Sequence, residues 1–196
     1  MHHGAMKFFR CLALAAMLCI WALVGTVQAV TYDLQAQVFT KTMPDGQVVT
    51  MWGYFNPAAP GTITDQFPLV LEVPAGDNTL TVNLTNNLPE FTSLQLSGFV
   101  DTAQTPTFFA DSQGQQRVRS FTREAGANGG TASYTWTVDR PGTFLLQSAS
   151  HLAVQVSMGL YATVKKNAAA GEAYGPPTAF QNEVVFLFSE IDPDLN

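Results

Sequence analysis

The chain has 196 residues, of which 46% are hydrophobic and 12% are charged. This apolar content excludes an intrinsically disordered chain, which would carry fewer apolar residues and more charge. There are 15 acidic residues against 9 basic ones, which gives a formal net charge of -6. Because a nucleic-acid binder normally presents a basic surface, we expect no nucleic-acid partner.

The N-terminal residues have the pattern of a secretory signal peptide. Lys7 and Arg10 precede an apolar run at residues 11–24, and small residues follow up to Ala29. A membrane-spanning helix needs about 20 apolar residues, and this run is shorter than that. The pattern predicts a signal peptide over residues 1–29 that is cleaved on export, a periplasmic or secreted location, and no membrane span after cleavage.

Cleavage would decide which redox and metal-binding side chains the exported chain keeps. Cys11 and Cys19 are the two cysteines of the sequence, and two of its three histidines also lie within residues 1–29. The exported chain would therefore have no thiol and a single imidazole, His151. Such a chain has neither a disulfide framework nor a thiol nucleophile, and its length suits one domain with an apolar core.

From residue 30 onward the sequence is a series of short apolar or alternating runs. Turn residues separate the runs, for example Pro-Asp-Gly at residues 44–46 and Arg-Pro-Gly at residues 140–142. No long helical pattern occurs, so we predict an all-β sandwich or barrel. The predicted strands are residues 31–40, 47–54, 69–73, 79–84, 93–99, 118–121, 132–138, 143–147, 158–164 and 184–189.

The C-terminal part of the sequence differs in composition from the preceding runs. Residues 165–182 are rich in small residues and proline, which predicts a linker. Residues 183–196 would hold a final strand and the start of a following segment. The expected organisation is a signal peptide over residues 1–29, one domain over residues 30–164, this linker, and the beginning of a further unit.

Three segments occur in an order that points to a protein family. Residues 73–86 contain VPAGD followed by the alternating LTVNLTN, residues 141–148 read PGTFLLQS, and residues 155–161 read QVSMGLY. Together they resemble the N-terminal cupredoxin domain of the multicopper oxidases. The resemblance implies that residues 30–164 form a Greek-key, cupredoxin-like β-sandwich.

The sequence departs from this family at the positions that would bind copper. Gln95 and Ser97 stand where the family shows a His-x-His motif, and Gln147 and Ala149 stand where it shows His-Ser-His. A blue copper centre also needs two His and one Cys, which the exported chain lacks. We therefore expect no catalytic, cofactor-binding or metal-binding residues on this chain, although copper is the cofactor of the family that it resembles.

His151 is the one residue with an alternative interpretation as a metal ligand. It lies two residues beyond the altered second motif. It is either a residual copper ligand, completed by another domain or subunit, or a loop histidine at the rim of the sandwich. A single His with no Cys makes a weak copper site, so we favour the loop histidine.

Two functions are compatible with these features. The first is an exported, multicopper-oxidase-like domain without its own copper ligands, inactive alone, which serves as a structural or interaction domain of a copper oxidoreductase. Its partners would be downstream copper-binding domains or another copy of the chain. The alternative is a stand-alone exported β-sandwich that binds a partner without redox activity. Its candidate binding face would use the aromatic residues Trp52, Tyr54, Phe55, Phe108 and Phe109.

Overall fold

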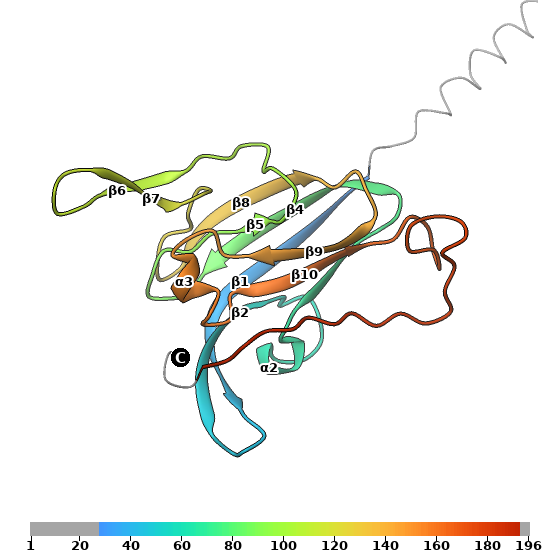
Figure 1. The fold of residues 1–196 in the computed structure, drawn as a ribbon, viewed down its shortest axis with the longest axis horizontal. Coiled ribbons are helices and arrows are strands. Elements are labelled where there is room, and N and C mark those ends of the chain that lie inside the picture. Colours follow the sequence, from blue (N-terminus) through green and yellow to red (C-terminus); the bar gives the residue numbers. More distant parts are fainter. Residues whose placement is uncertain (1–27, 193–196) are drawn as a thin grey trace, which may run out of the picture.

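A computed structural model of the chain describes residues 28–192 and shows a sandwich of two four-stranded sheets (Figure 1). The predicted signal peptide lies outside the described residues except for its last two positions, which begin the first strand. The first sheet has the order β2-β1-β4-β8 and the second the order β3-β10-β9-β5. The strands are β1 (Gln28–Thr42), β2 (Val48–Phe55), β3 (Val70–Val73), β4 (Asp77–Asn86), β5 (Gln95–Leu96), β8 (Gly130–Thr137), β9 (Gly142–Gln147) and β10 (Tyr161–Lys166).

Three smaller features complete the fold. Strands β6 (Thr107–Ala110) and β7 (Gln116–Ser120) form a two-stranded arm that extends beyond the sandwich (Figure 1). Two single-turn helices, α2 (Ile63–Gln66) and α3 (Leu152–Gln155), lie in connections between strands. No helix within residues 28–192 is long and apolar enough to cross a membrane.

The core lies between the two sheets because each strand turns alternate side chains inward. In β4, Leu80, Val82 and Leu84 are almost fully buried, and the side chains between them are more exposed. The rings of Tyr134 and Trp136 of β8 are stacked in the same layer, with their centroids 5.9 Å apart. Burying a large apolar side chain contributes about 1.5–3 kcal/mol, so these inward rows hold the sheets together. The predicted all-β sandwich is confirmed, and the second sheet supplies the other layer: Leu71, Val73, Leu146, Ala162 and Val164.

Some strand boundaries differ from the predicted ones. The run at residues 93–99 forms a ladder only at Gln95–Leu96, because Gly98 has a φ of +85° and turns the chain away. The run at residues 158–164 becomes a strand only from Tyr161, after a turn at Gly159 with a φ of +116°. A Cβ at Gly159 would lie 2.3 Å from the Trp52 carbonyl oxygen, so only glycine fits this turn.

The C-terminal segment, residues 183–192, is extended but is not a strand of either sheet, contrary to the strand predicted at residues 184–189. The predicted linker also begins later, because Lys165 and Lys166 belong to β10. The segment crosses β10 in the opposite direction: Lys165 Nζ contacts Glu183 Oε2 at 2.7 Å, and the Tyr161 hydroxyl donates to Ser189 Oγ at 2.7 Å. It therefore covers part of the outer face of the second sheet.

Candidate functional site

Two of the four positions at which the sequence resemblance predicts altered copper ligands lie side by side in the second sheet. Gln95 of β5 is the register partner of Gln147 of β9, and Gln147 is the partner of Tyr161 in β10. Their neighbours Leu96, Leu146 and Ala162 are buried in the core. Because side chains alternate along a strand, Gln95, Gln147 and Tyr161 form a row on the outer face.

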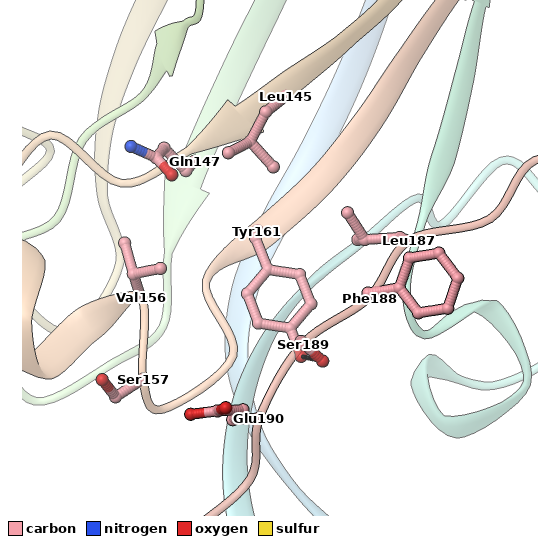
Figure 2. Close-up of a pocket in the computed structure, with 9 residues that line it drawn as sticks. All are labelled: Leu145, Gln147, Val156, Ser157, Tyr161, Leu187, Phe188, Ser189 and Glu190. Carbon is pink, nitrogen blue, oxygen red and sulfur yellow. Dashed lines mark hydrogen bonds between the residues drawn. The ribbon is translucent and has the colours of Figure 1, made fainter.

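An open groove of about 510 Å³ lies over Gln147 and Tyr161 of this row (Figure 2). Tyr161 lies in the middle, between residues 156–157 on one side and the C-terminal segment on the other. Burial raises the pKa of Tyr161 even though its hydroxyl is hydrogen-bonded to Ser189, so the phenol stays protonated at neutral pH. The lining residues are Leu145, Gln147, Val156, Ser157, Tyr161, Leu187, Phe188, Ser189 and Glu190.

The other two positions lie in different surroundings. Ser97 is exposed just beyond the end of β5, where its backbone N–H donates to the Leu145 carbonyl oxygen at 2.8 Å. Ala149 is 2% exposed, and its backbone N–H donates to Ser93 Oγ at 3.2 Å. The structure thus pairs Gln95 with Gln147, but of the four positions only Gln147 lines the groove.

Buried hydroxyl groups surround Ala149 and fix the chain that follows β9. Ser93 Oγ lies 2.9 Å from both Ser120 Oγ and Ser150 Oγ. The Ser148 hydroxyl donates to Gln155 Oε1 at 2.6 Å, and these side chains are fully buried. Buried polar groups are costly unless they are hydrogen-bonded, so this network stabilises one conformation of the segment.

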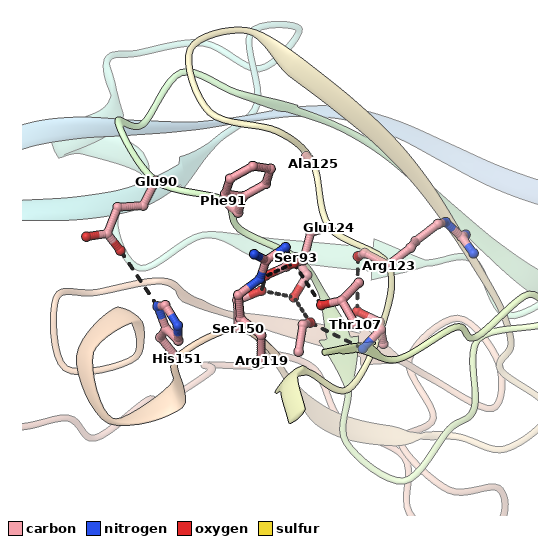
Figure 3. A network of polar contacts seen from close by, with 12 residues as sticks. Glu90, Phe91, Ser93, Thr107, Arg119, Arg123, Glu124, Ala125, Ser150 and His151 are labelled. Atoms are coloured by element: carbon pink, nitrogen blue, oxygen red, sulfur yellow. Dashed lines mark hydrogen bonds and ion pairs between the residues drawn. The ribbon is translucent and has the colours of Figure 1, made fainter. Parts of the chain in front are cut away.

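A carboxylate joins this network to the projecting arm (Figure 3). Glu124 accepts hydrogen bonds from the Ser150 hydroxyl at 2.7 Å, the Thr107 hydroxyl at 2.8 Å and Arg119 Nε at 2.8 Å. Its side chain is only 4% exposed. Burial by itself raises the pKa of Glu124, but the hydrogen bonds from Arg119, Ser150 and Thr107 outweigh it and hold the pKa below its usual value.

His151 lies at the end of this network and caps α3. Its φ of +40° is left-handed, which is uncommon for a residue with a side chain. Its Nδ1 lies 3.9 Å from Glu90 Oε2, and both side chains are half exposed (Figure 3). His151 therefore lies next to an acidic residue at the start of α3, at a different place from the Gln95–Gln147 row.

The donor set in the groove does not suit copper. Its lining offers one carboxamide, a protonated phenol, two hydroxyl groups and one carboxylate, whereas copper sites in proteins use imidazole, thiolate and thioether ligands. Within the part of the chain that the structure describes, no three or more His, Cys, Asp or Glu side chains are grouped so that they could hold a metal ion. What the groove can do is bind apolar and hydrogen-bonding groups.

The sequence prediction did not identify most of the groove. Tyr161 was part of the QVSMGLY segment, but nothing in that segment shows that its hydroxyl meets Ser189, 28 residues further on. The side of the groove that Leu187 forms, opposite Val156, likewise depends on how the C-terminal segment lies. The apolar run at residues 184–188 was the one signal that this segment contacts the body of the protein.

Comparisons with solved structures identify the fold. The structure is similar to a multi-copper oxidase from Pseudomonas thermotolerans, with a TM-score of 0.52 and 20% identity over 72% of this chain and 30% of that one. It is also similar to a laccase from Botrytis aclada, with a TM-score of 0.50 and 22% identity over 79% of this chain and 25% of the laccase. No protein-family model and no curated protein matches the sequence.

The similarity covers about one cupredoxin domain. The chain spans less than a third of the length of either of these two structures. At this level of identity the likeness shows a cupredoxin-like fold, which agrees with the resemblance seen in the sequence.

Proposed function

We propose that this chain is an exported cupredoxin-like domain without a copper centre of its own, which acts as a structural and interaction domain of a copper oxidoreductase. The observation that carries the proposal is the cross-strand pair Gln95–Gln147. By the sequence resemblance, these two carboxamides stand where the multicopper oxidases have imidazoles, and the groove on this outer face is lined by one of them, Gln147. The face keeps its place in the fold but has lost the chemistry that binds copper.

The C-terminal segment supports an interaction role for the same face. Its inward residues lie against the body of the protein, and its outward residues Val184, Phe186 and Phe188 are 71%, 76% and 90% exposed. Large exposed apolar patches are uncommon on monomeric proteins unless they contact a partner. The partners that fit the proposal are downstream copper-binding domains or another copy of the chain.

Copper titration of the purified exported chain tests the proposal. We expect less than one equivalent of tightly bound copper, no blue absorption band and no oxidase activity of the chain alone. One copper per chain with a blue band would overturn the proposal. N-terminal sequencing of the exported protein checks the expected start at Val30, and fractionation checks the periplasmic or secreted location.

A stand-alone binding module is the second candidate, and the projecting arm favours it. Phe108, Phe109 and Val118 on the arm, with Phe121 beside it, are 43–54% exposed. The structure does not place Tyr54 on such a face, since that side chain is fully buried in the core. The two candidates differ in the surface that they use, so substitutions on the arm and on the C-terminal segment separate them.

A further inference from the structure

The outward side of the C-terminal segment forms a narrow apolar ridge, which we define as Val184, Phe186 and Phe188. The side chains alternate along the extended chain: Val185 and Leu187 are half-buried toward the body, and the ridge residues face solvent. The Phe186 and Phe188 rings lie 6.3 Å apart and are stacked. The ridge is therefore continuous and ordered along one side of the segment.

A segment that is apolar on both sides is typical of a strand buried between two layers. Here only one layer is present, the outer face of β10. No strand within residues 28–192 pairs with residues 183–191 in a ladder. The second layer must therefore come from another molecule or domain if the ridge is to be buried.

The groove adjoins the Phe188 end of the ridge. Phe188 belongs to both, because it lines the groove and ends the ridge (Figure 2). Leu145, Val156 and Tyr161 supply the apolar part of the groove lining. An apolar ridge next to an apolar groove is a self-complementary surface, because a two-fold axis can place the ridge of each copy in the groove of the other.

The area of such a contact is sufficient for a stable dimer. Phe186 and Phe188 together can bury roughly 300–500 Å² on each copy. The groove exposes less surface than the ridge, so two ridges and the two grooves that receive them total roughly 900–1,300 Å², which reaches the lower end of the range for specific interfaces. The arm also has exposed phenylalanines, but the pocket beside it, lined in part by Val118, Phe121 and His151, is only about 160 Å³ and is smaller than the groove beside the ridge.

We propose that the chain forms a symmetric homodimer in which the Val184–Phe186–Phe188 ridge of one copy lies in the groove over Leu145, Val156 and Tyr161 of the other. This deepens the proposed function, on which it rests, by naming a second copy of the chain as the partner of that face. Each copy supplies one ridge and one groove, so the assembly closes at two.

The test measures the mass of the exported chain in solution by sedimentation equilibrium. We expect a dimer, and at least a tenfold lower association constant for Phe186→Ser/Phe188→Ser. The matched control is Phe108→Ser/Phe109→Ser on the arm, which should dimerise like the wild type. A monomeric wild type, or a dimer that the arm variant weakens and the ridge variant does not, would overturn the proposal.

A second measurement does not depend on weakening the interface. The exported chain has no cysteine, so Val184→Cys and Val156→Cys variants, which keep both phenylalanines of the ridge, can be made separately and mixed under oxidising conditions. The proposal predicts disulfide-linked heterodimers in the mixture, and their absence would contradict it. A copper-free monomer would overturn the dimer alone, whereas a blue copper protein of any mass would overturn the proposed function.

Discussion

Gln95 and Gln147 face each other across strands β5 and β9, and the sequence resemblance matches both to histidine positions of the multicopper oxidases. Directly opposed residues in an antiparallel pair have Cβ atoms about 4.5–5.5 Å apart, close enough for two side chains to bind one ion. The backbone geometry for a two-ligand site is therefore present, and the side chains are what the site lacks.

Gln95→His/Gln147→His should create a copper site in this row. Two imidazoles on one face suit Cu(II), so we expect at least tenfold tighter binding than in the wild type, measured by calorimetric titration. Copper should also raise the melting temperature of the variant, because it binds the folded state. Gln95→Asn/Gln147→Asn is the control and should bind as weakly as the wild type. If the histidine variant and the wild type bound copper with equal affinity, the side chains at positions 95 and 147 would not be able to bind one copper ion together.

The Tyr161 hydroxyl should hold the C-terminal segment in place. Tyr161→Phe removes the hydrogen bond to Ser189 Oγ, and we expect a loss of about 0.5–1.5 kcal/mol with faster amide hydrogen exchange in residues 183–192. Ser189→Ala should have the same effect. In the double variant the two effects should not add, because both substitutions remove a single interaction. Additive effects would show that the two residues act separately.

Most of the fold could be predicted from the sequence because it follows from local alternation. Leu80, Val82 and Leu84 share one face of a period-two run, and the structure buries that face. The predicted strands fail where a distant contact or a turn decides the outcome. Gly98 ends β5 early, and residues 184–189 are apolar like a strand but have no ladder partner among the described residues.

The candidate site was predictable only in part. The resemblance identified Gln95 and Gln147, and the sheet register then made them neighbours. The groove forms because the C-terminal segment returns across β10. The hydrogen bond between Tyr161 and Ser189 marks this return, and it exists only in the folded chain. Periodicity carries no information on contacts between segments so far apart in sequence.

The Glu124 carboxylate should make the stability of the arm dependent on pH. Its folded-state pKa is lowered, so its contribution is present above the unfolded value of about 4.3 and is lost as the pH falls through the folded value. Glu124→Gln should cost about 1–3 kcal/mol at neutral pH. Urea unfolding of both proteins should show this difference shrinking in acid. A difference that does not change between neutral and acid pH would contradict the assignment.

Lys166 should stabilise the end of the sandwich where β4, β8 and β10 meet. Its Nζ donates to the Asp77 and Val138 carbonyl oxygens at 2.7 and 2.6 Å and to Asn78 Oδ1 at 2.9 Å, with the residue only 4% exposed. Lys166→Met keeps the apolar stem but leaves these acceptors without a donor. Because an unsatisfied buried polar group costs about 1–3 kcal/mol, we expect at least that loss in the free energy of unfolding.

The adjacent lysine provides the matched control for this variant. Lys165 lies on the opposite face of β10 and pairs with Glu183 and Glu72, both of which lie on the outer side of the sheet. Ion pairs at a surface contribute about 0–1 kcal/mol, so Lys165→Met should cost less than Lys166→Met in chemical denaturation. It should instead increase hydrogen exchange near residue 183. Equal losses in the free energy of unfolding would mean that the buried hydrogen bonds of Lys166 do not hold the two sheets together. Each lysine would then stabilise the fold only through its charge.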